Sequence, residues 1–374
     1  MREIHITEVQ NKEDFNEFIN LPYKIHKKRK NWLPPLISDE KKLFDKDKNH
    51  NFKDCDTLLL VAKENNIVIG RIMGIISKIY NNGHNENCVR FCFLECYDDK
   101  EVFDLLINKI ENWGKQKGMT EIVGPLGFSD KDPQGFLIEG FDDPITVMIT
   151  NCSAQYMPQF MDQNKYQKKV DLFQYRLNIP KEIPEIYLKV FDRIKNRGFN
   201  LLEFKKIKDI QKYIKDVFEL INETYIEVYG FSPLNEIEMY EFSNRFLPLM
   251  NPRFIKIITN KEDKVLGFIV AMPDISRGLK KANGKLFPFG FIHVLKELKF
   301  SKQLNLLLGC VKSEYQNLGL FTLLSLPTIQ EAIKKKMKII DSHLILEDNI
   351  KMRAEIERFN GQVYKKYRIY KKDL

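Results

Sequence analysis

L-L-L-G-C-V-K-S-E-Y-Q-N-L-G-L-F, residues 306–321, joins an apolar run to a short polar turn and then to a helical pattern. The apolar run from Leu304 to Val311 predicts a buried strand, and the spacing of apolar residues after Leu318 predicts a helix to Lys336. The free N–H groups of the first helical turn would face an anion at the end of the strand, and Gly319 permits its close approach. This stretch therefore predicts a phosphate-binding turn, although it has neither the Lys-Ser/Thr of a P-loop nor three glycines.

The turn resembles the pyrophosphate loop of the GNAT superfamily of acyl-CoA N-acyltransferases. Five positions agree with the family pattern: Val311, Glu314, Tyr315, Gln316 and Gly319. Two positions depart from it, because Ser313 replaces the usual proline and Phe321 replaces a small residue. A strand at 339–346, a helix ending at Phe359 and a closing strand at 363–370 follow in the order that the superfamily uses. The resemblance implies an α/β (α+β) fold, a mixed and mostly antiparallel sheet flanked by helices.

The first half of the chain repeats this series of elements. Val68-Ile-Gly-Arg-Ile72 matches Val265-Leu-Gly-Phe-Ile269, and a strand at 89–96 with a helix at 101–117 parallels the strand and helix around Gly319. Asn151 corresponds to Asn349. We expect two tandem GNAT-like domains, residues 1–180 and 199–374, joined by a helix within 181–198. The segment Glu95–Glu101 is acidic and has no glycine, so the first copy is interpreted as degenerate, without a cofactor loop.

The resemblance also implies a cofactor site in the second copy. Acetyl-CoA or another acyl-CoA would be the co-substrate, and the amine would attack its thioester directly. The backbone of Cys310 and Val311 would pair with pantetheine, and Asn349 would lie near the sulfur. The pyrophosphate would bind at the turn, whose residues are Gln316, Asn317, Leu318, Gly319, Leu320 and Phe321.

Catalysis requires a base for the amine and a proton donor for the departing thiolate. The superfamily often places a tyrosine where this chain has Ile356. Glu347 is our candidate base, with helix capping as its alternative role. Tyr315 and Tyr364 are candidate donors, although tyrosines at such positions are more often packing residues. We interpret His343 and Cys310 as core side chains rather than as a base and a nucleophile.

Composition narrows the choice of partners and of compartment. The chain has 60 Lys and Arg against 51 Asp and Glu, a net charge of +9, which suits an anionic ligand but is also usual for solvated lysine-rich surfaces. We expect no nucleic-acid partner. The chain has no apolar run of about 20 residues, and Met1–His5 starts a strand rather than a signal peptide, so we expect a cytoplasmic protein without membrane contact. Its six cysteines lack metal-site spacing, and no metal site is predicted.

The sequence thus predicts an acyl-CoA-dependent N-acyltransferase that transfers acetyl to an amine of a small molecule or peptide. Two alternatives stay open: a Fem-type transferase that uses aminoacyl-tRNA, and a non-catalytic CoA-binding or scaffold protein. The Gly- and Pro-containing segment Met272–Pro288 is predicted to be an irregular loop that covers the site.

Overall fold

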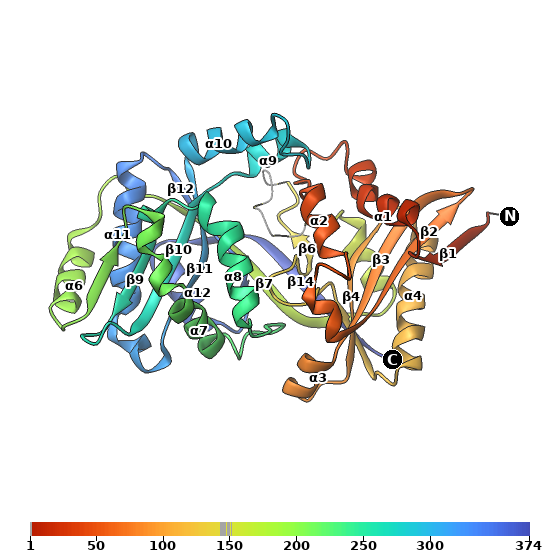
Figure 1. Cartoon of the computed structure of the whole chain (residues 1–374), viewed down its shortest axis with the longest axis horizontal. Coiled ribbons are helices and arrows are strands. Elements are labelled where there is room, and N and C mark those ends of the chain that lie inside the picture. Colours follow the sequence, from red (N-terminus) through yellow and green to blue (C-terminus); the bar gives the residue numbers. More distant parts are fainter. Residues whose placement is uncertain (1, 143–146, 148–149, 151) are drawn as a thin grey trace.

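The structure, a computed structural model, describes residues 2–142, 147, 150 and 152–374. Within those residues, strands from both halves join into one 14-stranded sheet with helices on both faces (Figure 1). The first half contains β1 (Ile4–Glu8), α1 (Lys12–Ile25), α2 (Ile37–Leu43), η1 (His50–Lys53), β2 (Cys55–Glu64), β3 (Ile67–Ser77), α3 (Lys78–His84), β4 (Cys88–Cys96), α4 (Lys100–Gln116), β5 (Glu121–Gly124), β6 (Phe136–Glu139), α5 (Tyr156–Gln163) and β7 (Gln167–Asn178). The second half contains α6 (Glu185–Lys195), β8 (Asn200–Glu203), η2 (Ile207–Asp209), η3 (Gln211–Tyr213), α7 (Ile214–Thr224), α8 (Glu236–Phe246), η4 (Leu247–Leu249), η5 (Pro252–Phe254), β9 (Ile255–Thr259), β10 (Val265–Pro273), α9 (Ser276–Ala282), α10 (Gly290–Phe300), β11 (Gln303–Val311), η6 (Ser313–Leu318), α11 (Leu320–Lys334), β12 (Ile339–Ser342), β13 (Ile345–Leu346), α12 (Ile350–Arg358) and β14 (Gln362–Asp373).

The two halves have the same strand order, counted from each outer edge of the sheet toward its centre. It runs β1-β2-β3-β4-β5-β14-β7-β12-β11-β10-β9-β8, with β6 beside β14 and β13 beside β7. The pairs β4–β5 and β11–β12 are parallel, and the other neighbouring pairs are antiparallel. The order from β1 to β5 is thus repeated from β8 to β12, which confirms the tandem repeat and the mixed, mostly antiparallel sheet.

The last strand of each half lies against the other half. β7 pairs with β12 and β13 of the second half, whereas β14 pairs with β5 and β6 of the first. The two exchanged strands also pair with each other, from Gln362–Arg176 to Lys371–Gln167, and they cross between the halves in Figure 1. The helix α6 lies inside the predicted 181–198 connector. The boundaries 1–180 and 199–374 stay predictions, but the sheet does not break between them.

Alternation along the strands sends apolar side chains into helices on both faces. On β10, the side chain of Phe268 packs in a cluster with Phe218 and Ile221 of α7, whereas the neighbouring Ile269 packs with Leu320 and Leu324 of α11. The first half is built in the same way, because α4 covers one face of β2–β4 and α1 covers the other. This layering positions the turn after β11 at the start of a buried helix.

Two local expectations were wrong. The segment Met272–Pro288 is not irregular throughout, because β10 continues to Pro273 and α9 forms from Ser276, with Leu279 and Ala282 buried. The strand predicted at 339–346 is divided into β12 and β13, since β13 leaves β11 to pair with β7. The correspondence of Asn151 with Asn349 lies outside the described residues.

Candidate functional site

The strands β11 and β12 separate at the position where the sequence predicted a cofactor. Their parallel pairing runs from Gln303–Ile339 to Leu306–Ser342, and one further hydrogen bond follows, from the His343 N–H to the Leu306 carbonyl at 3.0 Å. Beyond it, the chain that continues β12 turns away to β7. The backbone of residues 307–311 therefore has a sheet partner on the β10 side only, and we call the open side the splay.

The register of β11 decides which backbone groups face the splay. The Lys312 N–H donates to the Leu266 carbonyl at 2.8 Å, and hydrogen-bonding direction alternates along an antiparallel strand. Cys310 therefore directs its backbone N–H and C=O toward β10, whereas Gly309 and Val311 direct theirs toward the splay. A β-bulge at Leu307 opposite Val270–Ala271 sets this register.

A tyrosine that the sequence did not indicate closes part of the splay. Tyr225 follows α7 directly, and its hydroxyl donates to the Gly309 carbonyl at 3.1 Å. The backbone nitrogen of Gly309 lies 3.4 Å from the Tyr225 hydroxyl oxygen. Burial raises the pKa of Tyr225, and the charge of Asp130 adds to the shift. The phenol thus carries its proton at neutral pH. A tyrosine at the end of an amphipathic helix has no sequence signature that separates it from a packing residue.

His343 follows β12 on the other side of the splay. Burial lowers the pKa of its imidazole, while the carboxylate of Asp130 opposes that shift. A neutral imidazole is a proton acceptor. The backbone N–H of His343 makes the last hydrogen bond between β11 and the chain that continues β12. Its sequence context, apolar residues on a strand, gave no reason to choose it over a core histidine.

Asp130 reaches this site from the loop that follows β5 in the first half. Its backbone N–H donates to the Gly230 carbonyl at 3.1 Å, and Lys131 donates to the Ser232 carbonyl at 2.9 Å. The loop is therefore fixed against the segment that carries Tyr225. Both halves of the chain contribute charged or polar groups to one site.

The turn after β11 forms the start of α11 as predicted. Gly319 has a φ of +81°, a backbone conformation that favours glycine, and a Cβ there would lie 2.6 Å from Ile194 Cδ1, which would have to shift. The Gln316 amide donates to the Val311 carbonyl at 3.2 Å and accepts from Lys351 Nζ at 2.9 Å. Asn317 and Leu318 are exposed, whereas Leu320 is buried and Phe321 is half-buried. The exposed turn is thus open to an anion.

The three predicted catalytic side chains are each engaged elsewhere. Glu347 accepts from Lys168 Nζ at 2.9 Å and from the Asp171 N–H at 3.1 Å, which ties the chain after β13 to β7. Tyr364 donates to Asp341 at 2.7 Å, and Tyr315 packs edge-on against Phe199. Asn349 caps α12 by accepting from the Met352 N–H at 3.2 Å. The structure does not bring these side chains together at the splay, and their catalytic roles stay predictions.

Two further observations bear on the chemistry of the site. Burial raises the pKa of the Cys310 thiol to about 12, so it is a protonated thiol and a poor nucleophile at neutral pH. Among the described residues, no group of three or more His, Cys, Asp and Glu side chains could hold a metal ion.

The corresponding place in the first half is occupied by charged side chains. The Asp99 carboxylate caps α4 by accepting from the N–H groups of Glu101 and Val102 at 3.1 and 3.2 Å, and it also contacts Arg2. Glu95 takes the place of Cys310 on β4, where its carboxylate lies 3.7 Å from the Arg71 guanidinium. The first half thus has a side-chain cap at the helix N-terminus that corresponds to the uncapped N-terminus of α11 in the second half.

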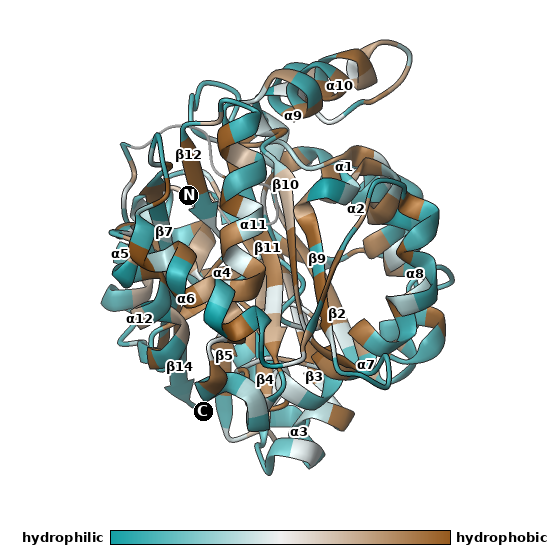
Figure 2. Cartoon of the chain, turned by 90° about the vertical axis from the view of Figure 1, so that its left-hand side faces the viewer, coloured by the Kyte–Doolittle hydropathy of each residue, from teal (hydrophilic) through white to brown (hydrophobic). Residues whose placement is uncertain are grey.

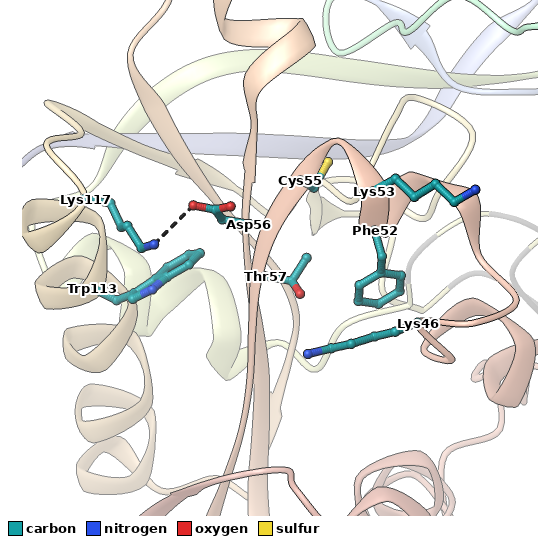
Figure 3. A pocket seen from close by; sticks show the side chains of 8 residues that line it. All are labelled: Lys46, Phe52, Lys53, Cys55, Asp56, Thr57, Trp113 and Lys117. Atoms are coloured by element: carbon teal, nitrogen blue, oxygen red, sulfur yellow. Dashed lines mark hydrogen bonds and ion pairs between the residues drawn. The ribbon is translucent and has the colours of Figure 1, made fainter.

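The first half has an open cavity of about 420 Å³ between η1, β2 and α4 (Figure 3). Lys46, Lys53 and Lys117 line it together with Trp113, and Lys117 lies 3.2 Å from Asp56. No residue of the second half lines this cavity, so it is separate from the splay.

Comparison with solved structures identifies the fold. A tandem GNAT protein from the clavulanic acid biosynthesis pathway, solved without acetyl-CoA, superposes with a TM-score of 0.55 at 11% identity, over 99% of this chain and 98% of that one. A probable N-acyltransferase of Enterococcus faecalis V583 superposes with a TM-score of 0.52 at 9% identity, over 99% and 73% of the two chains. The chain therefore has the fold of the GNAT superfamily, in its tandem form.

Two curated proteins are similar in sequence over almost their whole length. Protein YghO of Escherichia coli (strain K12) is 27% identical over 97% of this chain and 94% of that protein. The bacterial ceramide synthase of Caulobacter vibrioides is 26% identical over 100% of this chain and 98% of that protein. No protein-family model matches the chain. Among the described helices, none has the length and apolar character needed to cross a bilayer.

Proposed function

We propose that the chain is an acyl-CoA-dependent N-acyltransferase whose active site is the splay of the second half. The observation that carries this proposal is the separation of β11 from β12 after Leu306 and Ser342, directly before an exposed turn and the free N-terminus of α11. An extended pantetheine can pair with the backbone of Gly309 in place of the Tyr225 hydroxyl, and a pyrophosphate can bind at the turn. In the first half, β4 and β5 also separate after Arg90 and Val123, but the N-terminus of the helix that follows β4 is capped by Asp99.

We assign the acid–base roles to side chains around the splay. The amine nitrogen attacks the thioester carbonyl carbon, the C–S bond breaks, and an amide and a CoA thiol form. His343 accepts the amine proton, which its lowered pKa favours because the imidazole is then neutral. Tyr225 holds a proton at Gly309 and donates it to the departing sulfur. Glu347, Tyr315 and Tyr364 are the sequence-based candidates, and they are second choices because of their existing partners.

One of the two relatives suggests which amines to test. A ceramide is the amide of a fatty acid with a long-chain amino alcohol, so the ceramide synthase of Caulobacter vibrioides favours a long acyl chain and a long-chain amine as a second candidate pair. Acetyl transfer to a small amine or peptide is the first candidate pair, from the resemblance of the turn.

A carboxylate placed in the turn tests the cofactor assignment. Asn317→Glu puts a negative charge on the exposed turn, and we expect CoA affinity measured by calorimetry to fall at least about tenfold, or ~1.4 kcal/mol. Gly319→Asp is a poor test, because the positive φ and Ile194 would disturb folding. The matched control is Ile186→Glu, which places a carboxylate at an exposed position in the first turn of α6. Equal affinity of Asn317→Glu and the parent would contradict the assignment of the turn.

Thiol release then separates the candidate functions. The parent is assayed with acetyl-CoA and palmitoyl-CoA against a small amine, a peptide and a long-chain amino alcohol. Amine-dependent thiol release supports the transferase and identifies the pair. CoA binding without release by any pair would favour a scaffold, whereas transfer from aminoacyl-tRNA alone would favour the Fem-type alternative.

A further inference from the structure

Exposed apolar side chains gather on one small part of the molecule. Of the sixteen large hydrophobic side chains that are exposed among the described residues, six lie between positions 287 and 300. They are Phe287, Phe289, Phe291, Ile292, Leu295 and Phe300, and their exposed fractions reach 81% at Phe287 and 70% at Phe289. The other ten are distributed over the rest of the chain. A concentration of this kind, unlike single exposed residues, marks an interaction surface.

This surface belongs to a pair of helices that projects from the sheet. Figure 2 shows α9 and α10 standing out beyond the ends of the strands. The inner side of α10 packs through Val294 and Leu298 against Leu279 of α9 and Met272 of β10. Its outer side carries Ile292, Leu295 and Phe300, which none of the described elements covers. The inner contacts fold the pair, so the exposed apolar side chains are not needed for packing.

The same surface is strongly basic. Between 277 and 302 the chain has seven basic residues and one acidic residue, Glu297. Lys296 and Lys299 alternate with the apolar side chains on the outer side of α10, and both are exposed. Lys280 Nζ contacts the backbone carbonyl of Lys30, which brings the exposed end of the Lys27–Lys30 cluster to α9.

We propose that this surface, residues 277–302 with Lys27–Lys30, docks on an anionic membrane. An interfacial helix combines aromatic and aliphatic side chains, which enter the acyl boundary, with lysines that reach the phosphates along apolar stems. The outer face of α10 and the turn Phe287–Phe289 have that combination. The helix lies in the plane of the interface, consistent with the lack of a membrane-crossing helix among the described residues. The proposal departs from the sequence-based expectation of no membrane contact.

The positive charge of this surface favours a membrane over a second copy of the chain as its binding partner. A symmetric dimer through this surface would place two sets of seven basic residues against each other. An anionic bilayer instead adds a favourable interaction for each basic residue near its surface. The apolar cluster under α9 and α10 includes Leu307, the bulge residue of β11, so the docked surface adjoins the splay. The proposal does not rest on the acyl-transfer function.

Vesicle flotation tests the proposal directly. The full chain is mixed with vesicles of phosphatidylglycerol and phosphatidylcholine in equal parts, or of phosphatidylcholine alone, at low and high salt. We expect binding to the anionic vesicles that weakens with salt. Phe287→Ser with Phe289→Ser should lower partitioning at least tenfold, and Lys296→Gln with Lys299→Gln should lower it roughly 25-fold. The control, Ile186→Ser with Ile237→Ser, removes two exposed isoleucines from other helices and should bind like the parent.

Three outcomes would overturn the proposal. The first is a parent that does not float with anionic vesicles, and the second is binding that the variants on α10 and its turn leave unchanged. The third is light scattering that detects a dimer of the parent which Phe287→Ser with Phe289→Ser converts to a monomer, since the occupant would then be a second copy. Thermal unfolding of each variant confirms folding, and CoA calorimetry on the same samples reports independently on the cofactor turn.

Discussion

At the scale of single residues, the site depends on groups whose partners determine their chemistry. Gly309 offers a backbone N–H and C=O to the splay, and both lie within hydrogen-bonding distance of Tyr225. Cys310, one position further, offers none to the splay because its backbone faces β10. The backbone pairing with pantetheine that the family pattern implies is therefore better suited to Gly309 and Val311 than to Cys310.

Removal of one hydroxyl tests Tyr225. If Tyr225 protonates the leaving sulfur, Tyr225→Phe should lower kcat by roughly 10²- to 10⁴-fold and leave CoA affinity within about threefold. Tyr213→Phe is the matched control, because its hydroxyl bonds to Asp263 in the same half but outside the splay. Thiol release and calorimetry on both variants provide the readouts, and full turnover by Tyr225→Phe would exclude the role.

The pH profile tests His343 and Asp130 together. Since burial lowers the pKa of His343, kcat/KM should rise with pH through an acid limb below the ordinary histidine pKa of about 6.5 and then level off. The Asp130 carboxylate favours the protonated imidazole, so Asp130→Asn should move the limb to lower pH. A limb that stays in place in Asp130→Asn, or one that persists in His343→Gln, would contradict this assignment.

At the scale of elements, the two copies differ most at one helix N-terminus. The helix α4 begins after Asp99, whose carboxylate occupies its first N–H groups. The helix α11 begins after Gly319 and has no side-chain cap. An uncapped N-terminus on a buried helix leaves N–H donors for a ligand, whereas a capped one is satisfied within the protein. The choice between aspartate and glycine at these positions therefore decides whether the first N–H groups of the helix are capped by a side chain.

At the scale of the whole molecule, the exchanged strands link the two halves into one sheet. Tyr367 and Ile369 of β14 are completely buried with residues of the first half, such as Val123 and Leu137. The core of the first half therefore needs the last strand of the chain. We expect both halves to unfold in one cooperative transition, although the chain is long enough for two domains.

Calorimetry of Ile369→Ala tests this coupling. The truncation leaves a cavity and should cost about 2–5 kcal/mol, and the single transition should move to lower temperature as a whole. Val363→Ala on the same strand is the control and should cost within about 0.5 kcal/mol, because Val363 is exposed. A parent with two transitions, only one of which shifts in Ile369→Ala, would show that the halves unfold separately.

The sequence alone determined the features that depend on residues close together in the chain. The strand, turn and helix around Gly319 follow from local hydrophobic periodicity and one flexible residue, and the repeat follows from two such series in order. The acidic Glu95–Glu101 segment likewise indicated a first copy without an anion site, because charge at a helix start acts locally.

Tertiary structure decided what depends on partners distant in the chain. Which backbone groups of β11 face the splay is a matter of register, and the register is set by β10 and the bulge at Leu307. Asp130, Tyr225 and His343 come from three separate segments, so no spacing in the sequence relates them. The local sequence pattern also does not predict the exchange of β7 and β14. The periodicity of a strand indicates which of its faces is buried, but not which neighbouring strand it pairs with.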